Sequence, residues 1–351
     1  MDSPQHPARV VDLRSDTVTR PTEAMYERMR LAPLGDDGLD GDPTVGELEA
    51  VTAGVLGKEA GLFVSSCTMA NLLAVLAQVP RQEQIVLESA AHMYTSERGS
   101  ATFTGAFYLG VSGTSGAMDL DLLEDALQTG STKLKTALIA LETSHNNAGG
   151  AALPLDHMRA VRNIAEARGI AVHLDGARLF NAAVAQAVSP AEIAGHADTA
   201  SLCLSKGLSA PVGAVLVGSR RTIESARHFR KMLGGTQRQA GIMAAAGLEA
   251  VEHMVARLTE DHARARRLGA GLNGVHPHLS ASEPQTNIVQ VDVSKTARTS
   301  GQWVADLEQV GLLARPWGKN RLRCVTHRHI DDADIEFAVE AFRAVSTSLP
   351  G

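Results

Sequence analysis

Aromatic side chains are scarce in this sequence. Phe, Trp and Tyr make up 3% of its 351 residues, so a folded core has to be built mainly from Ala, Leu, Val and Ile. Hydrophobic residues of all kinds reach 44% and charged ones 21%, as in an ordinary soluble globular protein. A chain of this length is too long for one small core, and we expect a large domain and a smaller one.

Three further absences each exclude a class of protein. No apolar run is long enough to cross a bilayer, and residues 1–10 lack the core of a signal peptide. The formal charge of −6 is accompanied by no basic stripe, which excludes a typical nucleic-acid-binding protein. The cysteines are far apart and odd in number, so no disulfide framework is expected: Cys67, Cys203 and Cys324. We therefore expect a cytoplasmic protein with reduced thiols and without a membrane or nucleic acid partner.

From residue 43 onwards, apolar strands alternate with helices. Strands are expected at residues 61–64, 84–87, 107–111, 137–141, 170–174, 199–204 and 213–217. Helical patterns lie between several of them, at residues 45–56, 69–79, 119–128, 156–168 and 178–186. This alternation predicts a mainly parallel sheet covered by helices on both faces.

The pattern changes towards the C-terminus. Long helical patterns cover residues 220–232 and 239–272, and strand, helix, strand and helix follow at residues 287–293, 299–310, 321–325 and 331–346. We expect a large domain at residues 31–245 and a small α+β domain at residues 246–351. Residues 1–30 are expected to form an N-terminal segment that packs with the small domain.

Two charged residues stand at the ends of predicted strands, Asp175 after strand 170–174 and Lys206 after strand 199–204. Open α/β sheets bind ligands at the carboxyl ends of their strands, and a buried charge needs a partner or a covalent role. A lysine in an apolar pocket can form a Schiff base, and an acid can keep the ring nitrogen of pyridoxal 5′-phosphate (PLP) protonated. PLP would partner both residues. The alternative is that Asp175 caps the next helix and pairs with Arg178, while Lys206 lies in an ordinary turn.

Two loops suggest other ligands. Segment 65–68 lies between a strand and a helix, where backbone N–H groups and the helix dipole can bind phosphate, although Ser and Thr also cap ordinary helices. Loop 34–44 contains four acids, which makes calcium conceivable. Because the acids do not have EF-hand spacing, we expect a solvated or interface loop and no metal site: Asp36, Asp37, Asp40 and Asp42.

Five short motifs occur together and in a fixed order along the chain, at residues 12–19, 173–178, 204–208, 232–235 and 325–327. Together they resemble the PLP-dependent L-threonine aldolases, of the low-specificity or L-allo-threonine kind, from about residue 11 to the C-terminal helix. The resemblance implies a PLP-dependent transferase fold of type I, like aspartate aminotransferase, with a seven-stranded-type sheet in the large domain. It also implies a homotetramer, a dimer of dimers, with active sites between subunits.

The resemblance assigns roles to individual residues. Lys206 matches the lysine that holds PLP as a Schiff base, Asp175 the partner of the pyridine nitrogen, and His92 the histidine that stacks on the ring. His145 matches a second active-site histidine. The remaining matches are to the phosphate-binding turn at Ser66, Cys67 and Thr68, to cofactor-site arginines at Arg178 and Arg238, and to substrate-carboxylate ligands at Ser15, Arg178 and Arg323. Without the resemblance, both histidines would more often be structural, Arg323 a surface charge and Ser15 a turn residue.

The implied reaction is a retro-aldol cleavage of L-threonine, L-allo-threonine or a related β-hydroxy-α-amino acid into glycine and an aldehyde. Either histidine, or a water that they position, would take the hydroxyl proton. Another reaction on the same scaffold is the alternative, namely aldehyde transfer onto glycine, β-elimination or racemisation. A catalytically silent PLP-binding protein is a third possibility, against which the retained Lys206, Asp175, His92 and arginines argue.

The sequence departs from the family pattern at three places. Cys67 replaces the glycine of the phosphate turn, Leu39 stands where an active-site aromatic is usual, and the aromatic cluster after His92 is thinned to Tyr94, Thr95 and Ser96. We expect from these changes a roomier or more polar side-chain pocket that favours substrates bulkier than threonine.

Overall fold

The computed structural model describes residues 9–128 and 134–347, which form two compact units. One unit is Arg20–Val255, and the other combines Met1–Thr19 with Ala256–Gly351. The expectation about a signal peptide concerned residues 1–10, of which residues 1–8 lie outside the described part. Within the described part, none of the helices has both the length and the apolar character needed to cross a bilayer.

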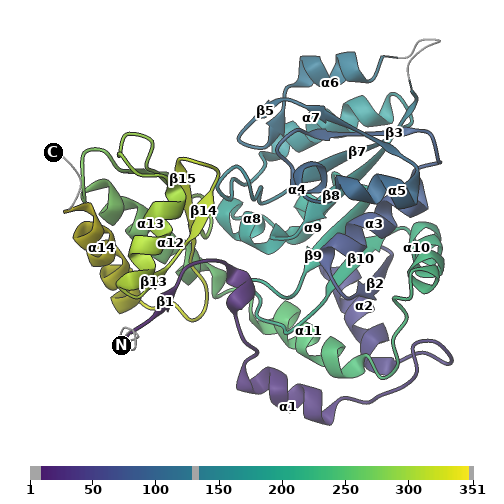
Figure 1. Ribbon diagram of the computed structural model, residues 1–351. Helices are drawn as coiled ribbons and strands as arrows, with labels where there is room; N and C mark the ends of the chain where they lie inside the picture. Colours follow the sequence, from purple (N-terminus) through teal and green to yellow (C-terminus); the bar gives the residue numbers. More distant parts are fainter. Residues whose placement is uncertain (1–8, 129–133, 348–351) are drawn as a thin grey trace. The chain divides into compact units, whose positions relative to one another are not determined.

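A seven-stranded sheet forms the centre of the unit Arg20–Val255 (Figure 1). Its strands lie in the order β2-β10-β9-β8-β7-β3-β4. Strand β10 runs opposite to the other six strands, which all point the same way, so the expected mainly parallel sheet is confirmed. The strands are β2 (Ala60–Val64), β3 (Gln84–Glu88), β4 (Phe107–Val111), β7 (Thr136–Glu142), β8 (Ala171–Gly176), β9 (Thr199–Cys203) and β10 (Ala214–Gly218).

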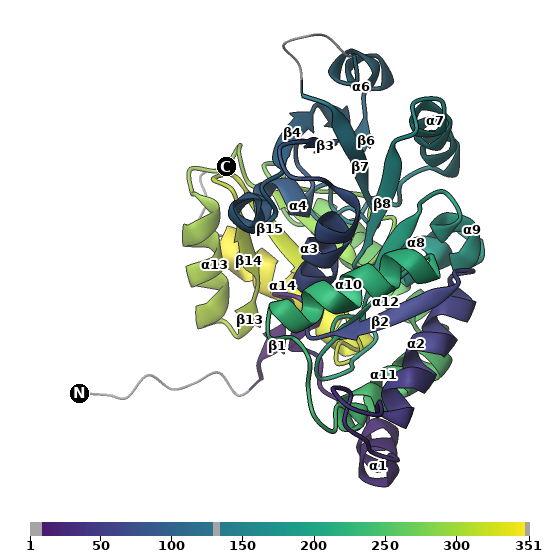
Figure 2. The same ribbon diagram turned by 90° about the vertical axis from the view of Figure 1, so that its right-hand side faces the viewer.

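Helices cover both faces of this sheet. Leu62 and Val64 of β2 pack with α3 (Cys67–Gln78) and α10 (Arg220–Met232), which lie side by side (Figure 2). Gly61 points to the other face, against α2 (Pro43–Val55), where an added Cβ would lie 2.6 Å from the backbone oxygen of Glu49. Glycine therefore permits this close approach of helix and strand.

Further short elements complete this unit. The helices are α1 (Glu23–Leu31), α4 (His92–Thr95), α5 (Ala101–Thr104), α6 (Leu120–Ala126), α7 (Leu155–Glu166), α8 (Leu179–Gln186), α9 (Pro190–Ala194) and α11 (Gly241–His253), with the 3-10 turn η2 (Arg98–Ser100). A small hairpin joins β5 (Gly113–Thr114) to β6 (Ala117–Met118). Local caps fix several helix starts; the Asp42 carboxylate, for example, accepts from the N–H groups of Thr44 and Val45 at the start of α2.

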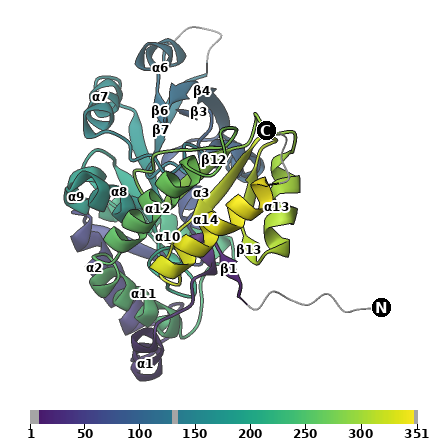
Figure 3. The same cartoon turned by 90° about the vertical axis from the view of Figure 1, so that its left-hand side faces the viewer.

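The second unit packs helices on a small antiparallel sheet of order β11-β12-β15-β14. Apolar residues of α12 and α14, which lie side by side in Figure 3, form its core with β12 and β15. Its strands are β1 (Val11–Asp12), β11 (Ser280–Ala281), β12 (Ile288–Asp292), β13 (Leu312–Leu313), β14 (Arg315–Trp317) and β15 (Arg321–Val325). Its helices are α12 (Leu258–Asn273), α13 (Ser300–Gln309) and α14 (Asp332–Ser346), with the 3-10 turn η1 (Asp16–Val18).

The division of the chain differs from the expected boundaries after residues 30 and 245. Strand β1 pairs with β13 of the C-terminal unit, but α1 packs against α11 and belongs to the large unit. The single long helix expected at residues 239–272 is wrong, because it is broken between His253 and Leu258 into α11 and α12. Neither glycine nor proline marks this break, which coincides with the change of unit after Val255.

Candidate active site

The carboxyl ends of three neighbouring strands bring polar side chains together. In the sheet register, Asp175 of β8 stands between Glu142 of β7 and Ser201 of β9. Asp175 is buried, and its carboxylate accepts hydrogen bonds from Asn71 Nδ2 and from the backbone N–H of Ala177, each at 3.0 Å. The predicted acid is thus held in a fixed orientation at the strand end.

Lys206 lies in the turn that follows β9 and lines, with Arg178 and Cys203, a cavity of about 10 Å³. Its charge also acts on the thiol of Cys67, whose sulfur is 3.8 Å from Asp175 Oδ1 and 3.2 Å from Ser201 Oγ. Burial, and after it the charge of Asp175, raises the pKa of Cys67 well above its usual range. The thiol is therefore neutral. Because the charges of Lys206 and Asp175 both influence its pKa, the two residues lie near the same thiol.

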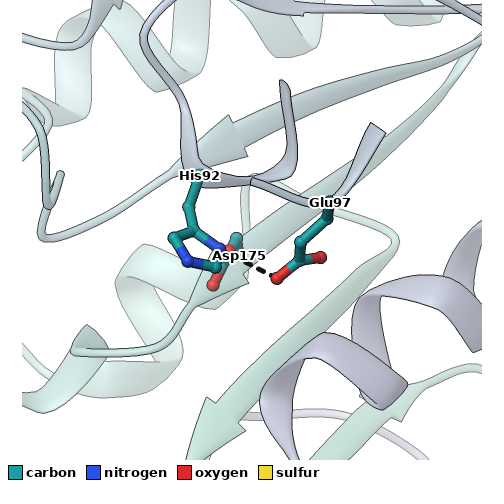
Figure 4. A group of neighbouring side chains, drawn as sticks. All are labelled: His92, Glu97 and Asp175. Atoms are coloured by element: carbon teal, nitrogen blue, oxygen red, sulfur yellow. Dashed lines mark hydrogen bonds and ion pairs between the residues drawn. The ribbon is translucent and has the colours of Figure 1, made fainter. Parts of the chain in front are cut away.

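His92, the first residue of α4, faces the same place (Figure 4). Its backbone N–H donates to Glu142 Oε2 at 2.5 Å, and its ring Nδ1 is 2.8 Å from Glu97 Oε1. The hydrogen bond to Glu97 raises the pKa of His92, although burial opposes it. His92, Glu97 and Asp175 each offer one ligand atom, and these three atoms lie within 4.8 Å of one another. A metal ion could therefore also fit there.

The tautomer of His92 follows from its partner. A carboxylate can only accept, so Nδ1 carries the hydrogen in the neutral ring and Nε2 carries the lone pair. Within residues 9–128 and 134–347, Nε2 has no hydrogen-bond partner, and the side chain is 39% exposed. His92 can therefore accept a proton at Nε2.

Glu97 is a site residue that the sequence did not reveal. Its carboxylate accepts from Thr68 Oγ1 at 2.9 Å and from Asn71 Nδ2 at 3.2 Å, in addition to His92. The side chain is only 7% exposed. The available signals were an acid five residues after a candidate base and Asn71, a polar side chain within an otherwise largely apolar helix.

His145 is placed differently. Its Nε2 lies 3.1 Å from Glu88 Oε2, its Nδ1 accepts from the N–H of Ala148 at 3.2 Å, and the residue is 1% exposed. Burial alone would lower the pKa of His145, but Glu88 and the nearby charge of Glu142 outweigh it and raise the pKa. Both ring nitrogens therefore have protein partners, and the catalytic role expected for His145 stays a prediction.

The turn before α3 leaves backbone donors available. Ser66 Oγ accepts from Met69 N–H as a helix cap, while the side chains of Cys67 and Thr68 bond to the residues around Asp175 and Glu97. Among the described residues, the N–H groups of Cys67 and Thr68 have no hydrogen-bond partner. Two such donors at the start of a helix of this length can bind a phosphate group.

The expected arginines lie in several places. Arg178 is buried just after β8, with Nη1 3.5 Å from Asn146 Oδ1. Arg238 is exposed and pairs with Asp36 at 3.2 Å. In the other unit, buried Arg323 donates to the backbone oxygen of Arg14, next to Ser15.

Most carboxylates of loop 34–44 form hydrogen bonds or ion pairs with other residues of the chain. Asp42 is buried and caps α2, and its Oδ2 accepts from the N–H groups of Gly35 and Gly241. Asp37 forms a 2.5 Å ion pair with Arg230. Asp37 and Asp42 thus attach this loop to the large unit, while Leu39 remains exposed, and the expectation of a solvated or interface loop stays a prediction.

The residues around Asp175 fit PLP. The lysine amine corresponds to the aldehyde of that cofactor, the buried carboxylate to its ring nitrogen and the partly exposed imidazole to its ring face. The two N–H groups at the helix start, which have no partner among the described residues, correspond to its phosphate. Asp175 is buried, and two N–H donors hold its carboxylate in a fixed orientation, as a partner for the ring nitrogen requires.

Comparison with known proteins agrees with this geometry. The profile of the family described as beta-eliminating lyase matches residues 12–296. A probable low-specificity L-threonine aldolase 2 of Arabidopsis thaliana is 39% identical over 345 residues, which cover 96% of this chain and 97% of that protein. The alanine racemase TOXG of Cochliobolus carbonum is 33% identical over 97% of this chain and 88% of its own length.

Two solved structures show the same fold. The threonine aldolase of Leishmania major superposes with a TM-score of 0.82 at 17% identity, covering 95% of this chain and 99% of that one. A structure of SPT with PLP has a TM-score of 0.75 at 18% identity, with coverage of 97% and 88%. The expected type I fold of PLP-dependent enzymes is confirmed.

Proposed function

This chain belongs to the L-threonine aldolases within the beta-eliminating lyase family, and we propose that it cleaves L-threonine, L-allo-threonine or related β-hydroxy-α-amino acids. The products are glycine and an aldehyde. The observation that carries this proposal is the convergence of Lys206, Asp175 and the His92–Glu97 pair beside the start of α3.

The residues divide the work of holding the cofactor and substrate. Lys206 supplies the amine that holds PLP, Asp175 keeps a proton on its ring nitrogen, and the N–H groups of Cys67 and Thr68 bind its phosphate. When bound, PLP provides a ring that takes up the electron pair of the broken Cα–Cβ bond. Arg178 binds the substrate carboxylate, which fixes the bond to be broken in one orientation. That Ser15 and Arg323 share this role, and that Arg238 contacts the cofactor, stay predictions.

Between the two candidate bases, the geometry favours His92. Its Nε2 carries a lone pair and its Nδ1–H is held by Glu97, so the ring is oriented to take the hydroxyl proton of the substrate. His145 has both nitrogens engaged by Glu88 and Ala148. His145 therefore acts, in this proposal, by holding the loop that carries Asn146 beside Arg178.

The test is product analysis with purified, PLP-loaded protein. L-Threonine, L-allo-threonine and L-phenylserine are supplied in turn, and aldehyde and glycine are quantified together. The proposal predicts that the two appear in equal amounts and that Lys206→Ala produces neither. Aldehyde-free consumption of substrate would contradict it.

Racemisation is the second candidate, because a protein named alanine racemase is 33% identical over nearly the whole chain. A racemase needs a proton donor and acceptor at Cα and releases no aldehyde. The same incubations, run with L-alanine and read by chiral chromatography, separate the two activities. Formation of D-alanine at a rate above that of aldehyde release would favour racemisation.

The substrate side chain is the finer part of the proposal. We expect phenylserine to be cleaved faster than threonine, because Leu39 and the segment Thr95–Ser96 lack the bulk of the aromatic residues usual in the family. The thiol of Cys67 points to Asp175 and Ser201, which leaves the phosphate donors of the turn accessible despite its side chain. Equal preference for threonine and allo-threonine over all bulkier substrates would count against a roomier pocket.

The proposal includes a cytoplasmic homotetramer. Exposed apolar side chains lie on α1, in loop 34–44 and on α11 of the large unit, as a covered surface would require: Tyr26, Leu31, Leu39, Ile242 and Met243. Cys67, Cys203 and Cys324 are all free thiols, in keeping with a reducing compartment. Sedimentation at micromolar concentration should give four times the 37.0 kDa chain mass.

A further inference from the structure

A row of buried polar side chains connects α3 with the sheet beside Asp175. His173 and Asp175 alternate along β8 and so face the same side, and the register sets Thr199 beside His173 and Ser201 beside Asp175. Asn71 and Gln78 lie seven residues apart on α3, on one face of the helix. Helix and strands therefore present complementary polar groups to each other.

The hydrogen bonds of this row run in one direction. Asp175 and Glu97 only accept, so the Nδ2 group of Asn71 must face them and its Oδ1 must accept. Oδ1 is 3.0 Å from His173 Nε2 and 2.9 Å from Ser201 Oγ, which are therefore its donors.

The far end of the row supports this direction. His173 Nδ1 then accepts from Thr199 Oγ1 at 2.9 Å, and Thr199 accepts from Gln78 Nε2 at 2.9 Å. Burial lowers the pKa of His173 to about 4, so the ring is neutral and has the lone pair that this arrangement needs. The donors and acceptors along the row are thus consistent with one direction, and the last donor is the amide of Asn71.

Asn71 ends the row at the two carboxylates of the site. Its Nδ2 donates to Asp175 Oδ2 at 3.0 Å and to Glu97 Oε2 at 3.2 Å, and the residue is 1% exposed. We propose that Asn71 is a positioning residue that fixes Asp175 towards the cofactor and Glu97 towards His92 through one amide group. This inference rests on the proposed function, because it concerns the same cofactor and the same base.

The substitution Asn71→Asp tests the amide with almost no change of shape. It replaces the shared donor by a third carboxylate. The groups around this carboxylate are Asp175 and His173 on β8, Glu97 and His92 in the segment after β3, and the neutral Cys67 thiol on the same helix. At high pH the three carboxylates repel one another. At lower pH the introduced carboxyl becomes protonated and regains one donor, so part of the function should return.

The measurement is the dissociation constant of PLP from the apoenzyme, followed by the visible absorption of the bound cofactor without substrate. For Asn71→Asp we expect binding about tenfold weaker than wild type or more at pH 8, the effect of one hydrogen bond to a charged group, and a smaller ratio at pH 6. Gln84→Leu is the matched control, because Gln84 is a buried amide of β3 that bonds Thr136 at 2.8 Å. It should lower thermal stability and leave the PLP dissociation constant within about twofold at both pH values.

The outcomes separate this inference from the proposed function. Binding of PLP by Asn71→Asp within about twofold of wild type at pH 8, or a loss that is the same at pH 6, would overturn the role of Asn71. If Asn71→Asp does not fold, Ser201→Ala decides, since it removes one donor to Asn71 Oδ1 and should weaken PLP binding about threefold; unchanged binding overturns the inference. Failure of the wild-type protein itself to bind PLP would instead contradict the proposed function.

Discussion

Glu97 determines which nitrogen of His92 can act as a base. Its hydrogen bond raises the pKa of His92, and the neutral ring is the form that takes a proton from substrate. Activity should therefore rise with pH through that pKa. In Glu97→Gln the charge is lost and the pKa falls, so we expect the ascending limb of kcat/KM against pH to move to lower pH.

A matched substitution shows which histidine is responsible. Glu88→Gln removes the corresponding charge from His145 and leaves His92 with its partner. If His92 is the base, Glu88→Gln keeps the wild-type position of the limb. A shift in Glu88→Gln with none in Glu97→Gln would assign the base to His145 instead.

For individual residues, the sequence was enough to identify those site residues that stand at the end of a single predicted strand. Asp175 and Lys206 stand at the ends of apolar strands, where the chemistry of an open sheet is concentrated. Asn71 and Glu97 could not be found in the same way, because their role depends on contacts across the fold. Asn71 meets Asp175 across 104 residues of chain, and no local pattern encodes that pairing.

His173 also makes the stability of the fold depend on pH. Its pKa is about 4 in the folded chain and about 6.5 when unfolded, so below pH 6.5 the unfolded chain binds the proton first. Stability conferred by the neutral ring is complete above pH 6.5 and is lost as pH falls towards 4. The loss should reach about 2 kcal/mol at pH 5. Urea unfolding at pH 7 and pH 5 should show a smaller loss in His173→Gln than in wild type; an equal loss would contradict this origin.

Among the elements, the contact between α2 and β2 depends on a single glycine. In Gly61→Ala the new Cβ would meet the backbone of Glu49, which cannot move aside as a side chain can. We expect a loss of about 1–3 kcal/mol in the free energy of unfolding, measured with urea. The control is Gly46→Ala. Gly46 lies on α2, the helix that packs on Gly61, and its added Cβ would have no atom within 4 Å, so this substitution should be neutral or slightly stabilising. Equal effects of the two substitutions would show that close packing of α2 against Gly61 does not govern the contact.

The elements were also the best-predicted level of the structure. The strands expected at residues 84–87, 107–111 and 321–325 agree with β3, β4 and β15 to within one residue, because each is an apolar or alternating run with clear ends. The break between α11 and α12 was missed, since Met254–Arg257 contain neither glycine nor proline. The chain there passes from one unit to the other, and tertiary packing overrides local helix propensity.

For the whole molecule, the central claim is that one lysine holds the cofactor at the end of β9. Borohydride reduction of the PLP-loaded protein fixes the cofactor to its lysine, and peptide mass spectrometry then identifies that residue. We predict the pyridoxyl group on the peptide that contains Lys206, in an amount close to one per chain, and its absence after reduction of Lys206→Ala. Attachment at Lys58, Lys231 or any other lysine, or no attachment at all, would contradict the account.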